Sequence, residues 1–200
     1  MNDNLYESLR NICEKRKSIR NFKEDKIPKE DIEKIIHIAS LSPYAGGRKK
    51  SWDIMVVDKV NKIQKIADIV ETKSKKSINN IKPIFRNNFL HYSKSFYSFR
   101  TAPVILIPIF KLNKGIKHIF EKPNDKLIEL ERDGVIKSIA CVCMLILLAA
   151  ESLGYGACFV HGACIANSEI IKLLGTKKNI AAIIPIGYEK KKESNNGAGK

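Results

Sequence analysis

Residues 132–162 read RDGVIKSIACVCMLILLAAESLGYGACFVHG, and this stretch decides the fold. Its middle, 139–150, carries no charge or amide over twelve residues, whereas a membrane span needs roughly 20 apolar residues. The pattern predicts a buried core helix that begins near Asp133 and ends at Gly154, followed by a strand over 155–161. A helix that is apolar on every side must be covered by the chain's own sheet and helices or by a second subunit.

Apolar runs of strand length lie on both sides of this stretch. The run 103–110, PVILIPIF, predicts a central strand, and 52–58 and 179–186 predict two more. Amphipathic helices are expected over segments that include 4–16, 29–41, 60–71 and 169–174. Four strands among about six helices predict an α/β (α+β) fold, a three-layer sandwich with helices on both faces of a central sheet.

The composition is that of one globular domain. The chain has 200 residues, of which 44% are hydrophobic, and we expect a single domain over 1–192 with a disordered tail over 193–200. Within it, 72–130 is predicted to be a basic, aromatic insertion of helical and lid segments. The N-terminus is polar and has no apolar signal region, so a cytoplasmic location is expected and no membrane association.

Cysteine spacing argues against a metal or disulfide framework. The chain has five cysteines, an odd number, and no Cys-x-x-Cys pair. Cys141 and Cys143 are two apart on the predicted helix and so point to different faces. These two, with Cys158 and Cys164, are interpreted as small buried hydrophobic residues, and no metal site is predicted.

The net charge of +15 is densest over 72–120, which has ten basic residues, no acidic residue and six interleaved aromatic residues before Arg100. Such a segment could be a nucleic-acid surface, in which aromatic rings stack on bases. It could also be a Lys-rich solvated helix with inward-facing rings, which we favour because no nucleic-acid motif accompanies it. A third interpretation is a positive entrance that attracts anionic small molecules or cofactor phosphates.

A possible anion receptor lies near the N-terminus. If residues 16–22 are extended, Arg16, Ser18 and Arg20 lie on one face, because side chains two apart share a face of a strand. Two guanidinium groups beside a hydroxyl suit a phosphate, since guanidinium binds phosphate through paired hydrogen bonds. An exposed basic turn is the alternative interpretation.

Four blocks of the chain, taken in order, resemble the FMN-dependent nitroreductase family. Residues 16–22 (RKSIRNF) resemble its R-x-S-x-R-x-F pattern, and 39–52 (ASLSPYAGGRKKSW) its loop before a Trp. Residues 147–162 (LLAAESLGYGACFVHG) are similar to its L-L-A-A-x-x-L-G-x-G block, and 183–188 (IIPIGY) to its terminal strand. The resemblance implies a nitroreductase-like fold with a mostly antiparallel sheet.

The resemblance also implies a homodimer with FMN at the subunit interface. In each subunit, one group would bind the phosphate, ribityl chain and N1/O2 edge of FMN: Arg16, Lys17, Ser18 and Arg20. A second group, Pro43, Tyr44 and Ala45, would reach the FMN of the other subunit. A third, Val160, His161 and Gly162, would lie against the flavin ring with backbone N–H groups toward N5. Gly162 is expected to be small so that the ring can approach it.

The function implied is electron transfer from NADH or NADPH through the flavin to a nitroaromatic, quinone or similar acceptor. The flavin carries this chemistry, so no side chain is required as a dedicated acid or base, and His161 is a weak candidate for a proton donor. One alternative is a non-catalytic FMN-binding protein, which would share every block. A basic nucleic-acid-binding module is the other alternative.

Overall fold

The structure is a computed structural model that describes residues 3–44, 52–112 and 115–191. Its α-helices are α1 (Asp3–Lys15), α2 (Lys29–Ser40), α3 (Val60–Ser77), α4 (Arg86–Ser93), α5 (Gly115–Ile119), α6 (Asp125–Ser152) and α7 (Asn167–Leu174). Its strands are β1 (Trp52–Val57), β2 (Val104–Phe110), β3 (Gly156–Ala157), β4 (Asn179–Ile180) and β5 (Ile184–Gly187). Four short 3-10 helices connect them: η1 (Ile78–Asn80), η2 (Pro83–Phe85), η3 (Lys94–Thr101) and η4 (Gly162–Ala166).

The strands form one antiparallel sheet in the order β1-β2-β5-β3, with β4 also paired to β2. The apolar run around β2 makes the central strand, and six of its seven residues are buried. Pro108 is tolerated there as a pair of Ile54, although proline donates no ladder hydrogen bond. The predicted central strand and the mostly antiparallel sheet are therefore confirmed.

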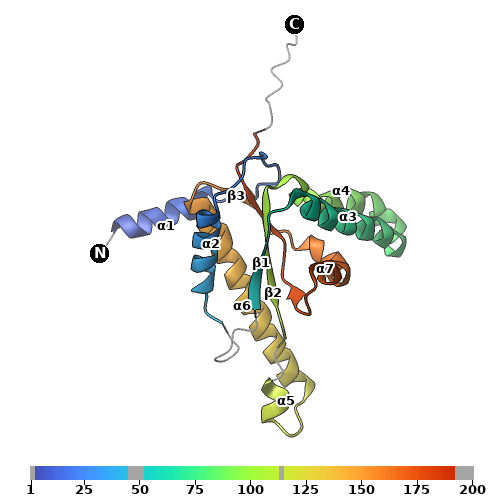
Figure 1. Cartoon of the computed structure of the whole chain (residues 1–200). Coiled ribbons are helices and arrows are strands. Elements are labelled where there is room, and N and C mark those ends of the chain that lie inside the picture. Colours follow the sequence, from blue (N-terminus) through green and yellow to red (C-terminus); the bar gives the residue numbers. More distant parts are fainter. Residues whose placement is uncertain (1–2, 45–51, 113–114, 192–200) are drawn as a thin grey trace.

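Helices cover both faces of the sheet (Figure 1). Helices α2 and α6 lie on one side, and α3, α4 and α7 lie on the other. Each face has its own buried cluster: one joins α2 and α6 to residues such as Trp52 and Ile184, and the other joins α3 and α7 to residues such as Phe99 and Ile105. The three-layer arrangement predicted from the sequence is confirmed.

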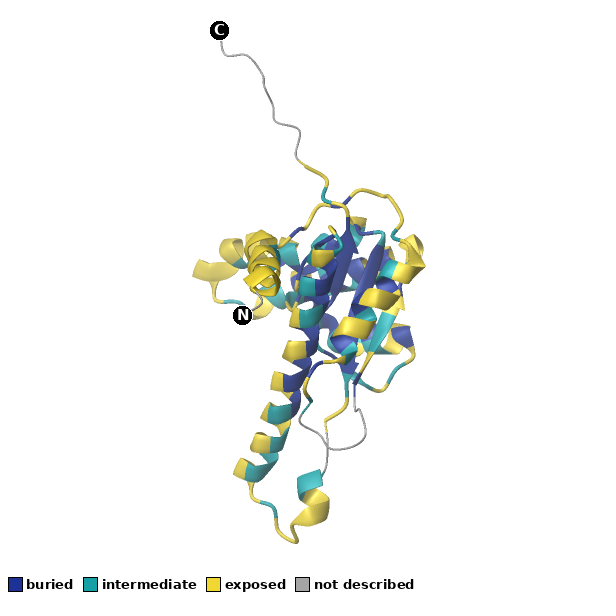
Figure 2. Cartoon of the chain, turned by 90° about the vertical axis from the view of Figure 1, so that its left-hand side faces the viewer, coloured by how far each residue is buried: buried dark blue, intermediate teal, exposed yellow. Residues whose placement is uncertain are grey.

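The core helix α6 is longer than predicted. It begins at Asp125, where the side chain of Asn124 accepts a hydrogen bond from the Leu127 N–H, so Asp133 is not its cap. Its C-terminus is as predicted, with Gly154 in the left-handed region at φ 81°. The helix is long and apolar enough to cross a membrane, but half of its most apolar window is buried inside the protein. Figure 2 shows its N-terminal end, beyond the sheet, as exposed or half-buried.

Two predicted strands are shorter or broken. The expected strand over 155–161 contains only β3, followed by an isolated bridge between Val160 and Ile183. The expected strand over 179–186 divides into β4 and β5. Within the range 72–130, β2 occupies the predicted strand 103–110, and α6 begins before the range ends. The predicted tail over 193–200 lies outside the described residues.

The cysteine prediction holds in part. Cys143 and Cys158 are buried and Cys164 is half-buried, whereas Cys141 is exposed on α6. Burial raises the pKa of the Cys143 thiol to about 12 and that of Cys164 to about 11, so both stay protonated and unreactive at neutral pH. Among the described residues, no cluster of three or more His, Cys, Asp or Glu side chains could hold a metal ion.

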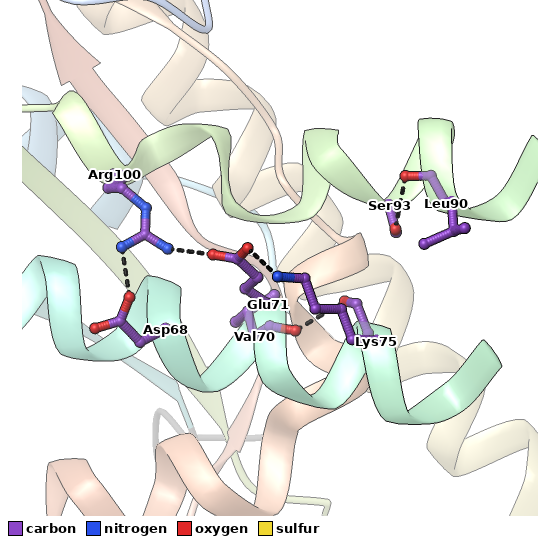
Figure 3. Close-up of polar contacts among 8 residues, drawn as sticks. Asp68, Val70, Glu71, Lys75, Leu90, Ser93 and Arg100 are labelled. Atoms are coloured by element: carbon purple, nitrogen blue, oxygen red, sulfur yellow. Dashed lines mark hydrogen bonds and ion pairs between the residues drawn. The ribbon is translucent and has the colours of Figure 1, made fainter. Parts of the chain in front are cut away.

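A polar network joins α3 to η3 on the face of the sheet that α3 covers (Figure 3). The Arg100 guanidinium donates to the carboxylates of Asp68 and Glu71, and the Glu71 contact measures 2.7 Å. Lys75 approaches the second carboxylate oxygen of Glu71 at 2.7 Å. The network fixes the return of the chain from the α3–α4 hairpin (60–101) to β2.

We predict that Glu71 makes stability depend on pH. The hydrogen bond from Lys75, supported by the charges of Lys75 and Arg100, lowers the pKa of Glu71 below its usual 4.5. A carboxyl with a lowered folded-state pKa adds stability above its unfolded pKa and loses it as pH falls through the folded pKa. Thermal unfolding should therefore show Glu71→Gln less stable than the wild type at pH 7, with the gap closing below about pH 4. A gap that stays constant down to pH 3 would contradict this role.

Candidate functional site

The candidate site runs along the edge of the sheet formed by β3. Ser18 bridges Ala157 in parallel, and the Ile19 N–H donates to the Ala157 carbonyl at 3.0 Å. Further along, Val160 and Ile183 exchange two backbone hydrogen bonds of 2.9 and 3.1 Å. His161 follows Ala157 by four positions, so the edge is at most about 13 Å long over this segment. The structure thus brings the predicted groups 16–20 and 160–162 to one edge.

Two cations at one end of this edge have no carboxylate partner. Arg16 is half-buried and Arg20 is exposed, and neither makes an ion pair within the described ranges. Lys17 differs, because its Nζ lies 3.0 Å from Glu189 Oε2. Buried Ile19 and Phe22 anchor the segment in the core and so leave its polar side chains on the surface. Arg16, Ser18 and Arg20 remain available for an anion.

Two aromatic rings mark the other end. Phe159 and His161 are exposed and alternate with buried Cys158 and Val160, as side chains do in extended chain. The two rings are nearly parallel, with an interplanar angle of 5° and centroids 6.2 Å apart. Both rings project from the same side of the extended chain and together present a flat surface to solvent. The sequence analysis had named His161 but not Phe159, so Phe159 is a residue it missed.

The tautomer of His161 follows from its partner. Its Nδ1 lies 3.0 Å from the Ala181 carbonyl oxygen, and a carbonyl only accepts hydrogen bonds. Nδ1 therefore carries hydrogen, and Nε2 is the free nitrogen of the neutral ring. The backbone N–H groups of His161 and Gly162 donate to no acceptor in the part of the chain that the structure describes.

Gly162 does not have the surroundings expected from the sequence. A Cβ atom placed on Gly162 would lie 2.1 Å from Cδ1 of Phe96, so the ring of Phe96 already fills the space above this glycine. Phe96 is buried and belongs to η3. Gly162 is thus small because the chain's own ring packs on it. The signal was present in the sequence, since Phe89, Tyr92 and Phe96 recur at helical spacing.

In the second predicted group, Pro43, Tyr44 and Ala45, the described residues do not lie at this edge. Pro43 is exposed, and the Tyr44 ring is 6.4 Å from that of Trp52, which pairs with Phe110 at the far end of β2. Ser18 lies near the opposite end, beyond Val104, about 20 Å away by strand length. Ala45 lies outside the described residues. Within one chain, Pro43 and Tyr44 do not join the site.

One hydrogen bond connects the start of the site to α2. The Tyr155 hydroxyl donates to Oδ2 of Asp31 at 2.7 Å, and Tyr155 is buried against the ring of Tyr188. The hydrogen bonds from Lys34 and Tyr155 lower the pKa of Asp31, whereas burial and the Asp31 carboxylate raise that of Tyr155. Tyr155, the residue before β3, is therefore held in place as a neutral hydrogen-bond donor.

Comparison with known proteins identifies the family of the chain. The sequence pattern of the nitroreductase family matches residues 13–188, which include both ends of the site. The chain belongs to the nitroreductase family. The match spans most of the chain, so the family resemblance predicted from the four blocks is confirmed.

A curated relative of the chain is named for a deiodination reaction. Iodotyrosine deiodinase from Hydra vulgaris is 26% identical over 187 residues, which are 88% of this chain and 63% of that protein. The chain thus spans less than two thirds of that relative.

Solved structures share the nitroreductase fold. A BluB-like flavoprotein from Clostridium difficile 630 superposes with a TM-score of 0.81 at 23% identity, over 96% of this chain and 94% of the other. Iodotyrosine deiodinase bound to FMN and 3-iodo-L-tyrosine gives 0.69 at 21% identity, over 96% and 95%. A nitroreductase with bound FMN from Desulfitobacterium hafniense DCB-2 gives 0.68 at 16% identity, over 96% and 94%. At these identities the likeness establishes the fold.

Proposed function

We propose that the protein is an FMN-dependent oxidoreductase that takes electrons from NADH or NADPH and passes them to a nitroaromatic, a quinone or a similar acceptor. One observation supports the proposal: along a single sheet edge, Arg16 and Arg20 at one end have no carboxylate partner among the described residues, and the backbone N–H groups of His161 and Gly162 at the other have no acceptor there. Two relatives of the same fold are named as FMN-bound. A cytoplasmic location remains part of the expectation.

The residues present fit FMN. Arg16 and Arg20 would hold the phosphate or the electron-rich edge of the ring, with Ser18 as a neutral donor and Lys17 kept in place by Glu189. The N–H groups of His161 and Gly162 would donate to the ring. When bound, the flavin accepts a hydride and passes two electrons on. Arg16 or Arg20, fixed beside the ring, would stabilise the negative charge that accompanies reduction, because the positive charge is already in position.

His161 can move a proton only through Nε2. Its Nδ1 is held by the Ala181 carbonyl, so the ring cannot turn without losing that hydrogen bond. The side chain would donate a proton only from the charged form, in which both nitrogens carry hydrogen. We therefore assign His161 first to orientation of the strand end and only second to proton transfer.

A second copy of the chain would complete the site. Helix α1 has no buried residue although Leu5 and Leu9 repeat at helical spacing, and they are 67% and 54% exposed. On α6, exposed Ile136, Ala140 and Met144 form a stripe with a spacing of four residues. We propose that a partner covers these faces in a homodimer and brings its own Pro43 and Tyr44 to the flavin.

Met144→Arg is expected to disrupt this dimer. A cation placed in an apolar interface loses hydration without gaining a partner, which weakens association by several kcal/mol, on the order of a thousandfold. Light scattering after gel filtration should give twice the 22.6 kDa chain mass for the wild type and the single mass for the variant. The matched control is Leu173→Arg, an exposed leucine on α7 in the opposite layer, which should remain dimeric. A monomeric wild type would refute the assembly.

The function is tested by an absorption spectrum of the protein after FMN loading and removal of free flavin. We expect a bound flavin band that bleaches under nitrogen with NADH or NADPH and recovers when an acceptor is added. For a nitro acceptor, reduction to the nitroso compound consumes one NAD(P)H and one proton and releases water. The acceptor series should include a quinone and an iodinated phenol.

Each rival function predicts a different result. A band that persists with both nicotinamide nucleotides would favour a non-catalytic FMN-binding protein. Absence of retained flavin, together with a gel shift of oligonucleotides at physiological salt, would favour the nucleic-acid module, whose affinity must fall steeply with salt.

A further inference from the structure

The α3–α4 hairpin carries a pocket that the proposed function has not used. Its volume is about 630 Å³, and its lining includes Lys82, Phe85, Asn88, Phe89 and Tyr92. The sequence analysis favoured inward-facing rings in this segment, which is correct for Phe96 and Phe99. It is wrong for Phe85 and Tyr92, which are 54% and 64% exposed. Aromatic rings exposed around a concave surface are typical of a binding site.

One ring connects this pocket to the flavin site proposed above. Phe96 stands edge-on to Phe89, with centroids 6.2 Å apart, and to Tyr92, with centroids 5.0 Å apart. The same ring fills the space above Gly162 at the strand end. The aromatic lining therefore continues from the pocket through Phe96 to the residues proposed to contact the flavin ring.

The charge around the pocket has one sign. The sequence has no acidic residue over 72–120, and Lys82 on the pocket wall makes no ion pair with any described residue. Arg86 Nε donates to the carbonyl of Ile81, a lining residue, at 3.1 Å, and its other N–H groups have no partner among the described residues. Asn88 adds a neutral donor and acceptor. A ligand there would meet aromatic surface and positive charge together.

We propose that this pocket binds the electron acceptor, and that the preferred acceptors are aromatic anions, such as aromatic carboxylates and phenolates. This inference rests on the proposed function and names its substrate class. Phe85, Phe89 and Tyr92 provide the stacking surface, and Lys82 on the pocket wall binds the anionic group. Arg86, which is held by the carbonyl of the lining residue Ile81, adds positive charge next to the pocket. The described lining of the pocket includes no carboxylate that could pair with an ammonium group, so aromatic cations are disfavoured as ligands.

A pair of substrates of equal size tests the charge preference. 4-Nitrobenzoate and 4-nitrobenzamide differ chiefly in charge, and their kcat/KM values are compared on the flavin-loaded protein. Lys82→Gln should lower the benzoate-to-benzamide ratio about threefold to tenfold, mainly through KM. Tyr92→Ala should lower both values by about tenfold, because both rings stack. The matched control, Lys117→Gln on α5, removes the same charge from an exposed site away from the pocket and should leave the ratio unchanged.

A binding measurement separates this proposal from the function on which it rests. Saturation-transfer NMR with 4-nitrobenzoate and no reductant should show binding that Lys82→Gln weakens and Lys117→Gln does not. If no acceptor is reduced but this pattern holds, the pocket assignment stands and the oxidoreductase assignment fails. Turnover with an unaltered ratio in Lys82→Gln overturns the pocket. Displacement of 4-nitrobenzoate by a dT oligonucleotide at lower concentration than benzoate also overturns it.

Discussion

Gly162→Ala is expected to lower the free energy of unfolding by about 2–3 kcal/mol, a large effect for the addition of one methyl group. The new Cβ would lie 2.1 Å from the Phe96 ring, and Phe96 is buried and packed against Phe89 and Tyr92, which restricts movement of the ring. Urea unfolding should show a lower midpoint with an unchanged slope. Gly162→Val should have a still larger effect.

A double-mutant cycle identifies the cause. In the Phe96→Leu background the smaller side chain leaves room for Cβ, so the cost of Gly162→Ala should fall by at least about 1 kcal/mol. An equal cost in both backgrounds would mean that the backbone of η4, and not Phe96, requires glycine. The cycle also distinguishes this packing role from the flavin contact expected from the sequence, since it is measured without flavin.

Removal of both Arg16 and Arg20 is expected to weaken FMN binding at least about 100-fold. Each hydrogen bond to a charged group contributes about 1.5–3 kcal/mol, and neither guanidinium has a competing carboxylate in the described structure. Quenching of FMN fluorescence gives the dissociation constant of Arg16→Ala/Arg20→Ala. Stability should change little, because the buried anchors of the segment, Ile19 and Phe22, are retained.

The control for this prediction is Arg10→Ala, which removes an exposed arginine of α1 that pairs with Glu7. Arg10→Ala removes one positive charge, as Arg16→Ala or Arg20→Ala alone does. Because Arg10 lies away from the sheet edge, the affinity for flavin should be nearly unchanged. If Arg10→Ala and the Arg16 and Arg20 variants weakened binding alike, the effect would come from net charge and the phosphate assignment would fail.

The elements that the sequence predicted well are those with uninterrupted apolar patterns. Two such apolar runs are stable only when they are buried, and they therefore identified β2 and α6: 103–110 and 139–150. The start of α6 was missed because 125–134 is polar and extends beyond the sheet, where no burial pattern marks it. Strand β3 was overextended because its pairing depends on β5 and Ser18, which are distant in sequence.

The candidate site was predictable to a similar degree. The segment 16–20 was identified by its charge and spacing, and the structure places it beside Ala157. The contact between Phe96 and Gly162 was not identified, since it joins residues 66 positions apart and only a three-dimensional structure brings them together. The role proposed for Pro43 and Tyr44 would depend on a second chain, which the sequence of one chain does not describe.

The edge of the sheet at β3 has a further consequence for solubility. An open strand edge exposes unpaired N–H and C=O groups on which another chain can add, which leads to aggregation. Here the backbone at Ser18 and Ile19 closes that edge through its pairing with Ala157. The segment proposed to bind the cofactor is thus also the cover of an aggregation-prone edge. Cofactor occupancy and resistance to aggregation should therefore rise and fall together in this protein.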